Sequence, residues 1–262
     1  MKLLFLGTGT STGVPEIGCA CETCTSSDLK DKRLRSSALL ETDDGKRILL
    51  DCGPDFRLQI LTAIATNHLS LITNHTIDGV LLTHEHYDHV GGLDDLRIFS
   101  RHGAIPIYAQ ARVAEAIRRC MPYAFRENKY PGAPDLQLYH IDNVTAFSIG
   151  DNEITPIALM HGKLPIYGYR IGKMAYLTDL KTIPETEYGK LNDLDVLVIN
   201  ALRPQPHVAH ENIEEALRNI ERIRPKRAYL THISHHFGKQ AVVQRDLPDH
   251  VHIAYDGLIV DI

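Results

Sequence analysis

The stretch Thr83-His84-Glu85-His86-Tyr87-Asp88-His89 directly follows the apolar segment Gly79–Leu82. It places four residues of metal-ligating type within six positions, in the pattern HxHxDH. Side chains alternate along a chain that leaves a strand, so His84 and His86 are expected to face one way, while Asp88 and His89 turn toward a second point nearby. Such a cluster has little structural use, because protonated imidazoles held this close repel one another. The stretch therefore predicts ligands for two neighbouring metal ions.

Three further residues of ligand type each follow a segment expected to be a strand. They are His161 after Ile154–Met160, Asp179 after Met174–Thr178 and His232 after Arg227–Thr231. Imidazole nitrogen and carboxylate oxygen are suitable ligands for Zn²⁺, Mn²⁺ or Fe²⁺, and mixed sites of this kind with an open position are catalytic. The alternatives are structural: His161 alone is typical of a packed or solvated histidine, and Asp179 alone of a helix or turn cap.

Short apolar segments rich in β-branched residues recur along the chain and are expected to be strands. They are Lys2–Gly7, Arg47–Leu50, Gly79–Thr83, Ile105–Tyr108, Thr145–Ile149, Ile154–Met160, Tyr167–Ile171, Met174–Thr178, Val196–Ile199, Arg227–Thr231 and Ile253–Ile262.

Apolar residues return at intervals of three and four in the segments expected to be helices. These are Phe56–Ala65, Leu93–Arg101, Arg112–Cys120 and Ile213–Ile223. Because the helices do not follow each strand in turn, the order favours an α/β fold of two sheets packed face to face with helices outside, over a strictly parallel arrangement. The region Met121–Gln137, rich in Pro, Tyr and Gly, is expected to be a surface excursion near the site.

The bulk properties are those of an ordinary globular protein, with 44% hydrophobic and 23% charged residues. At 262 residues, one domain spanning 1–262 is the first expectation. The apolar run at the start stops too early for a signal peptide, and no stretch reaches the ~18 apolar residues of a membrane span, so we expect a soluble cytoplasmic protein. A net charge of −5 argues against nucleic acid as a partner and leaves a small anion, attracted by bound cations, as the expected ligand.

Three of the five cysteines lie in Cys19-Ala20-Cys21-Glu22-Thr23-Cys24. The CxCxxC spacing favours tetrahedral zinc over a disulfide framework. A fourth ligand is needed, and His235, three residues beyond His232, is the best candidate. The alternative is three free thiols in a flexible loop.

The ordered set formed by the HxHxDH motif, His161, Asp179 and His232 resembles the signature of the metallo-β-lactamase superfamily over nearly the whole chain. The resemblance implies a four-layer αββα sandwich. It also implies that His84, His86 and His161 bind one metal, that Asp88, His89 and His232 bind the other, and that Asp179 bridges them. Asp51, in Leu49-Leu50-Asp51-Cys52-Gly53, matches an early aspartate that supports the site without binding metal.

Three segments further resemble the PhnP group of cyclic phosphodiesterases: the CxCxxC loop, Leu50–Arg57 and Thr231–His235. That resemblance implies a structural zinc held by Cys19, Cys21, Cys24 and His235. It also implies a catalytic histidine in Pro206-His207-Val208-Ala209-His210, at the position of His210. His207 is the alternative at this position, and either histidine could instead cap the helix that follows.

The function implied is metal-dependent hydrolysis of a small cyclic phosphodiester, such as a ribosyl 1,2-cyclic phosphate or a 2′,3′-cyclic nucleotide. Two Zn²⁺, Mn²⁺ or Fe²⁺ ions would lower the pKa of water and offset charge on the phosphate. Asp88 and His210 are the catalytic candidates, with a protonated His210 contacting the phosphoryl group or the departing ribose oxygen. Arg57, Arg97 or Arg203 would hold a second phosphate.

Other functions remain open at this point. A tRNA-processing nuclease on the same scaffold would need a basic arm that the sequence does not contain. A thioester, carboxyl-ester or lactam hydrolase would use the same activated water. From a different class, the chain could be a non-catalytic metal-binding protein of cofactor biosynthesis. A homodimer is the expected assembly.

Overall fold

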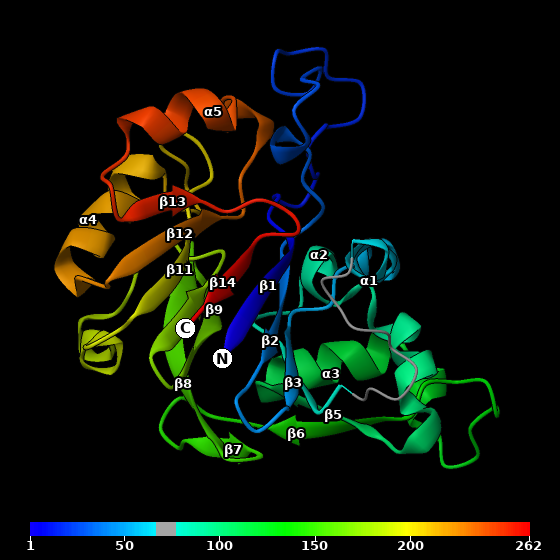
Figure 1. The fold of residues 1–262 in the computed structure, drawn as a ribbon. Helices are drawn as coiled ribbons and strands as arrows, with labels where there is room; N and C mark the ends of the chain where they lie inside the picture. The colour runs from blue at the N-terminus through cyan, green and yellow to red at the C-terminus, as the bar shows by residue number, and fades with distance from the viewer. Residues whose placement is uncertain (67–76) are drawn as a thin grey trace.

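The computed structural model describes residues 1–66 and 77–262. Two seven-stranded sheets pack face to face, with helices covering the outer side of each (Figure 1). The first and last strands pair, which brings the two chain ends together (Figure 1). The expected α/β sandwich is confirmed.

The first sheet has the strand order β14-β1-β2-β3-β4-β5-β6. Strands β3 to β6 run parallel, and the pairs from β14 to β3 are antiparallel. Their bounds are β1 Lys2–Gly7, β2 Ser37–Glu41, β3 Arg47–Leu50, β4 Gly79–Leu81, β5 Ile105–Ala109, β6 Leu136–His140 and β14 Ile259–Asp261.

The second sheet repeats this pattern in the order β13-β12-β11-β10-β9-β8-β7. Strands β10 to β13 run parallel, and the pairs from β7 to β10 are antiparallel. Their bounds are β7 Phe147–Ile149, β8 Asn152–His161, β9 Leu164–Ile171, β10 Met174–Leu177, β11 Val196–Asn200, β12 Arg227–Thr231 and β13 Val251–Ile253.

Helices α1 and α3 cover the first sheet, and α4 covers the second (Figure 1). A capping box between Asn212 and Glu215 begins α4, and left-handed Arg224 ends it. The α-helices are α1 Phe56–Ala65, α2 Tyr87–Val90, α3 Ala111–Cys120, α4 Ile213–Ile223 and α5 Gln240–Val243. The 3₁₀ segments are η1 Leu29–Asp31, η3 Leu93–His102, η4 Pro122–Phe125, η5 Glu185–Leu191, η6 His235–Phe237 and η7 Gln244–Asp246.

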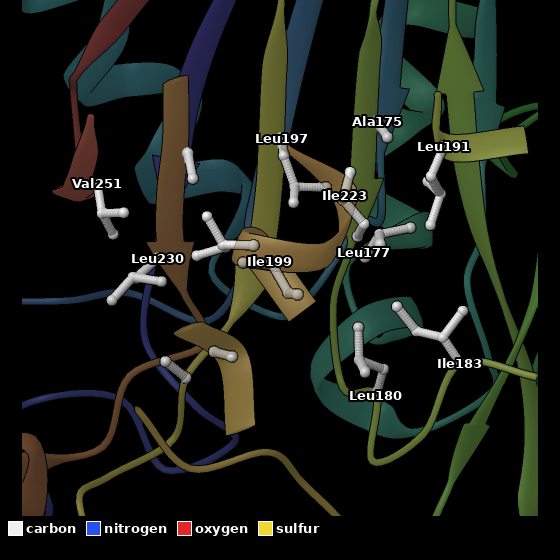
Figure 2. Close-up of a cluster of buried hydrophobic side chains, with 14 of the residues drawn as sticks. Ala175, Leu177, Leu180, Ile183, Leu191, Leu197, Ile199, Ile223, Leu230 and Val251 are labelled. Carbon is white, nitrogen blue, oxygen red and sulfur yellow. The ribbon is translucent and has the colours of Figure 1, made fainter. Parts of the chain in front are cut away.

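Alternation of apolar side chains along the strands builds three buried layers. In β1, Leu3 and Phe5 enter the core between the sheets, whereas Leu4 enters the core beneath α1 and α3. In β11, Val198 faces the inter-sheet core and Leu197 faces outward, toward α4. Figure 2 shows this outer cluster of the second sheet, with side chains of the strands lying against the α4 helix. Both faces of each sheet are therefore buried, which holds the strand ends rigidly in place.

Three expectations need correction. The segment Ile253–Ile262 is not one strand, because Asp256 and Gly257 form a turn that carries the chain from β13 in one sheet to β14 in the other. Gly257 has a φ of 90°, and Asp256 accepts hydrogen bonds from Thr8 Oγ1 (2.7 Å) and Leu34 N (2.6 Å).

The expected helix Leu93–Arg101 is a 3₁₀ segment that ends at His102, and the excursion after Met121 ends where β6 begins at Leu136. Strands β2 and β6 were not expected as strands. Within the described residues, none of the helices combines the length and apolar character needed to cross a bilayer.

Candidate metal centre and active site

The HxHxDH stretch lies at the carboxyl end of β4 but is not a continuation of it. The strand ends at Leu81, and a short helix, α2, begins after His86. The alternation that we expected from an extended strand is therefore not the reason that these side chains meet. An extended loop carries His84 and His86, and the first turn of α2 carries Asp88 and His89.

Residues far apart in the sequence gather here in two adjacent groups, in each of which the ligand atoms lie within 4.8 Å of one another. The first group is His84, His86 and His161; the second is Asp88, His89, Asp179 and His232. Asp179 also lies within the same distance of His161 and His210, so its carboxylate stands between the two groups. The structure thus brings together all seven of the residues expected to bind the two metals.

Three of the clustered imidazoles are held from behind by a hydrogen-bond partner, whereas the Nδ1 atom of His232 is buried without one among the described residues. His89 Nδ1 lies 2.7 Å from Asp51 Oδ2, and His84 Nδ1 lies 3.0 Å from Thr83 Oγ1. His161 Nδ1 donates to the carbonyl oxygen of Ala209 at 2.9 Å. A partner on one ring nitrogen fixes the tautomer and directs the other nitrogen, Nε2, into the cluster.

Asp51 is fully buried and supports the cluster without joining either group. Besides His89, it accepts hydrogen bonds from the backbone N–H and the hydroxyl of Thr83, both at 2.9 Å. Thr83 then contacts His84. Asp51 therefore orients His89 of the second group directly and His84 of the first group through Thr83. The superfamily resemblance implied a supporting position for Asp51, and the structure places this residue behind His89 and Thr83.

Three residues of the site have left-handed backbones, which are uncommon for residues other than Gly and occur mainly at Asn, Asp and His. The φ angles are 58° at Asp51, 58° at Asp179 and 54° at His232. Each stands just beyond a strand end, where the chain must turn sharply to direct its side chain into the cluster. Such conformations cost ~1–3 kcal/mol each and concentrate at functional sites.

The donor set fits divalent metal ions. The Nε2 atom of His84 is buried without a hydrogen-bond partner among the described residues, and the Nε2 atoms of His89 and His232 contact carboxylate oxygens of the same cluster. Leaving buried polar atoms unpaired costs ~1–3 kcal/mol each, a cost that a bound cation would remove. Asp179 Oδ1 lies 3.1 Å from His232 Nε2, and Asp179 Oδ2 lies 3.1 Å from His89 Nε2.

The ionisation of two ligands suits metal binding directly, and that of a third requires a proton to leave. Burial alone would lower the pKa of His89, but the carboxylates of Asp179 and Asp51 raise it well above its usual range, so its imidazole must release a proton before it binds a metal ion. Burial, together with the charge of His89, holds the pKa of His84 well below its usual range, so the imidazole is neutral and can act as a ligand. Burial alone would raise the pKa of Asp179, but the imidazoles of His232 and His89 hold it well below its usual range. Asp179 is therefore a carboxylate.

His210 lies against both groups. Its ring is 4.4 Å from that of His161 and 4.9 Å from that of His232, and its Nδ1 is 3.7 Å from Asp179 Oδ1. Burial lowers the pKa of His210 to about 3, so without substrate the ring is neutral rather than protonated as we expected. His207 has a different role, since its Nδ1 accepts the backbone N–H groups of Ala209 (3.2 Å) and His210 (3.3 Å) and closes the turn that presents His210.

The cysteine loop meets the same end of the sandwich at His235. The ligand atoms of Cys19, Cys21, Cys24 and His235 all lie within 4.8 Å of one another. Cys19 Sγ is 3.1 Å and Cys21 Sγ is 3.4 Å from His235 Nδ1. The Cys24 backbone N–H and His235 lower the pKa of Cys21 to about 6, which favours its thiolate. Three thiols and one imidazole in this arrangement form the donor set of a structural zinc site.

A short loop connects this cysteine cluster to the second ligand group, because His235 follows His232 by three residues. Ile233, between them, donates its N–H to Thr8 O at 2.9 Å and accepts from Thr10 N at 3.1 Å. The loop after β1, which leads to the cysteines, is thereby tied to the backbone next to His232.

The arginines proposed for a second phosphate are placed differently. Arg97 pairs with Asp94, and Arg203 donates to Pro206 O at 3.2 Å within the segment that carries His210. Arg57 is exposed on α1. Among the described residues, none of these three arginines forms an ion pair with Asp88 or Asp179, the carboxylates of the two ligand groups.

Sequence reasoning missed two hydroxyls at the site. Thr83 Oγ1 contacts His84 and Asp51, and Thr178 Oγ1 donates to Asp179 Oδ2 at 2.8 Å. A signal was present, because Thr directly precedes a ligand in Thr83-His84, Thr178-Asp179 and Thr231-His232.

Comparison with known proteins shows the family to which this chain belongs. The family model described as "Beta-lactamase superfamily domain" matches residues 46–233, which contain all seven residues of the two groups. The chain belongs to the metallo-β-lactamase superfamily. As a superfamily member, it is similar to the crystal structure of "a New Diphosphatase from the PhnP Family", with a TM-score of 0.88 and 36% identity over 100% of this chain and 97% of that one.

Two other similar proteins are matched over different shares of their own length. An octanoyltransferase from Porphyromonas gingivalis is 46% identical over 98% of this chain, and the chain spans about half of its length (51%). The Zn²⁺-bound PqqB of Methylobacterium extorquens has a TM-score of 0.75 over 100% of both chains, and its 18% identity shows a shared fold alone.

Proposed function

We propose that this chain is a dinuclear metal-dependent phosphodiesterase that hydrolyses small cyclic phosphodiesters. The observation that carries the proposal is the pair of adjacent ligand groups with the Asp179 carboxylate between them and His210 beside both. His84, His86 and His161 would hold one ion, Asp88, His89 and His232 the other, and Asp179 both. Zn²⁺, Mn²⁺ or Fe²⁺ bound there would lower the pKa of water to near neutral and polarise a phosphoryl oxygen.

The chain's own residues supply orientation and hydrogen bonds. Asp51 and Thr83 hold His89 and His84 in fixed tautomers, so the site is organised before substrate arrives. The neutral His210 ring would donate one N–H to the phosphoryl group or to the departing ribose oxygen. Its position is set by His207, which closes the preceding turn.

Charge and resemblance favour a small phosphodiester over the alternatives. A net charge of −5 is unfavourable for a long nucleic-acid footprint. The PhnP-family likeness at 36% identity is to a protein called a diphosphatase, which supports phosphoester chemistry. The octanoyltransferase is about twice as long as the stretch that matches this chain, so its name can describe the part outside the match. A structural zinc at the cysteine cluster completes the proposal.

A substrate panel tests this function. Protein reconstituted with Zn²⁺ or Mn²⁺ would be assayed with a ribosyl 1,2-cyclic phosphate, 2′,3′-cyclic nucleotides, a diphosphate diester, an acyl thioester and a β-lactam. We expect the highest kcat/KM with a cyclic phosphodiester. Faster hydrolysis of the thioester or lactam would overturn the proposed substrate class, and absence of turnover in protein with full metal content would overturn the enzyme assignment.

His210→Ala is expected to lower kcat by ~10²–10⁴ while metal content stays unchanged, because the ring contacts substrate and not the ions. His140→Ala, an exposed histidine at the end of β6, is the matched control and should behave as wild type. Steady-state kinetics and elemental analysis of the same samples check both. Loss of bound metal in His210→Ala would instead make His210 a ligand, as its closeness to His161 and Asp179 would permit.

A further inference from the structure

Strand β11 lies between β10 and β12, the strands that lead to Asp179 and His232, but it ends at an asparagine rather than at a ligand. The side chain of this residue, Asn200, is fully buried. It stands between the apolar run Val196–Ile199 and the buried Ala201. Burying an amide is unfavourable unless its hydrogen bonds are made, so Asn200 is poorly suited to a purely packing role.

The Asn200 amide makes one hydrogen bond among the described residues. Its Oδ1 accepts the backbone N–H of Leu180 at 2.7 Å, whereas its Nδ2 is buried without a partner there. Leu180 directly follows Asp179, whose φ is 58°. Asn200 is therefore attached to the chain just after the sharp turn that directs the Asp179 carboxylate into the cluster.

Leu180 is held at two further points. Its side chain is fully buried in the outer cluster of the second sheet, where Figure 2 shows it. Its carbonyl oxygen accepts the N–H of Glu211, which directly follows His210, at 2.9 Å. The Glu211 carbonyl in turn accepts the N–H of Leu202, two residues beyond β11, at 2.9 Å. The end of β11 thus holds both the Asp179 turn and the segment that carries His210.

The contacts of Asp179 differ in origin. Its contacts with His89 and His232 lie within the second ligand group itself. The hydrogen bond of Asn200 to Leu180 comes from outside both ligand groups. Bonds from a carboxylate oxygen to Zn²⁺ span only ~2.0–2.2 Å, so a carboxylate shared by two ions must be placed accurately relative to both. A contact from outside the ligands can supply that placement before any ion binds.

We propose that Asn200 is a positioning residue, which holds the Asp179 turn through the Leu180 N–H and thereby sets the metal affinity of the dinuclear cluster. The inference rests on the proposed function, in which Asp179 bridges two bound ions. Asn200 acts through Asp179 and is not itself a ligand, because it belongs to neither group. Removing residues that orient metal ligands from behind typically lowers metal affinity by ~10–100-fold.

Asn200→Leu removes the acceptor with little change in side-chain volume. Mn²⁺ is the probe, because it suits imidazole and carboxylate ligands better than the thiolates of the cysteine cluster. Titration of the full chain with Mn²⁺ against a competing chelator is expected to show ~10–100-fold weaker binding in Asn200→Leu. Asn200→Asp keeps an oxygen at the same position and should bind Mn²⁺ at least as tightly as wild type. Equal weakening in both variants would overturn the inference.

Gln59→Met, on α1, is the matched control. Gln59 is another buried amide, 2% exposed, whose Nε2 donates to Arg35 O at 2.8 Å and whose Oε1 has no partner among the described residues. Gln59→Met and Asn200→Leu each remove one hydrogen bond between a buried amide and the backbone, so both should lower the Tm of the metal-free protein similarly. Only Asn200→Leu should weaken Mn²⁺ binding. The same loss of affinity in Gln59→Met would assign the effect to general stability and overturn the inference.

Amide hydrogen exchange of Leu180 tests the hydrogen bond directly. The Leu180 N–H should exchange slowly in the wild-type protein and at least ~10-fold faster in Asn200→Leu. Asn200→Thr replaces Asn200→Leu if that variant misfolds, since Thr matches Thr231, the paired residue on β12, and its hydroxyl is one bond too short to reach Leu180. Fast exchange of the Leu180 N–H in the wild-type protein would by itself overturn the inference.

Turnover distinguishes this inference from the proposed function. Weaker Mn²⁺ binding in Asn200→Leu, when the wild-type protein hydrolyses no phosphodiester, would support the positioning role and contradict the phosphodiesterase. Wild-type Mn²⁺ affinity in Asn200→Leu, when the wild-type protein hydrolyses a cyclic phosphodiester, would overturn the positioning role and leave the function standing.

Discussion

Asp179→Asn is expected to lower kcat/KM by at least ~10³ and to reduce the metal content of the dinuclear cluster. Metal ions contribute several kcal/mol to transition-state stabilisation, and the only carboxylate positioned between the two described ligand groups is lost. Asn keeps the side-chain shape and tolerates the left-handed backbone at this position, where φ is 58°. Elemental analysis and steady-state kinetics measure the two effects.

Asp193→Asn provides a closely matched control. Asp193 is also left-handed, with a φ of 55°, but its side chain is 77% exposed and pairs with Lys173 on the surface. Its substitution should change neither metal content nor turnover. Bound metal also stabilises the folded state by mass action, so the rise in Tm on adding Zn²⁺ should shrink in Asp179→Asn alone. Full metal content and activity in Asp179→Asn would contradict the role given to this residue.

Cys21→Ala is expected to remove one zinc per chain and to lower Tm by about 5–10 °C. A structural zinc site contributes folding free energy directly, and each kcal/mol lost shifts Tm by ~2–4 °C in a protein of this size. Apart from the 3₁₀ turn Leu29–Asp31, the described loop between β1 and β2 has no helix or strand to stabilise it. Hydrogen exchange should therefore increase first in residues 10–32.

Cys120→Ser tests whether the effect is specific, because Cys120 is an exposed thiol outside the cluster. We expect it to retain zinc and the wild-type Tm. Since Ile233 ties the cysteine loop to the backbone beside His232, Cys21→Ala should also weaken metal binding at the dinuclear cluster. Zinc content equal to wild type in Cys21→Ala would contradict the site.

The sequence predicted that distant residues meet, because residues of ligand type stand at the ends of segments that were recognisable as strands. His161 ends β8, His232 directly follows β12, and Asp179 lies two residues beyond β10. Strands β10 and β12 are buried on both faces, so their apolar runs were clear, and Arg227–Thr231 was predicted with the bounds that the structure has. The cysteine spacing was equally specific and led to the cluster completed by His235.

Other features depend on tertiary contacts that no local pattern reveals. The turn at Asp256 is set by Thr8 and Leu34, more than two hundred residues away, so Ile253–Ile262 looked like one strand. The neutral state of His210 likewise follows from burial that appears only in the folded chain.

Anomalous X-ray diffraction from crystals of the metal-loaded protein, recorded at the absorption edges of zinc and manganese, locates the bound ions. We expect two neighbouring peaks, one beside His84, His86 and His161 and one beside Asp88, His89 and His232, with Asp179 contacting both. A third, zinc peak is predicted among Cys19, Cys21, Cys24 and His235. Crystals of fully loaded protein without paired peaks at Asp179 would contradict the dinuclear site.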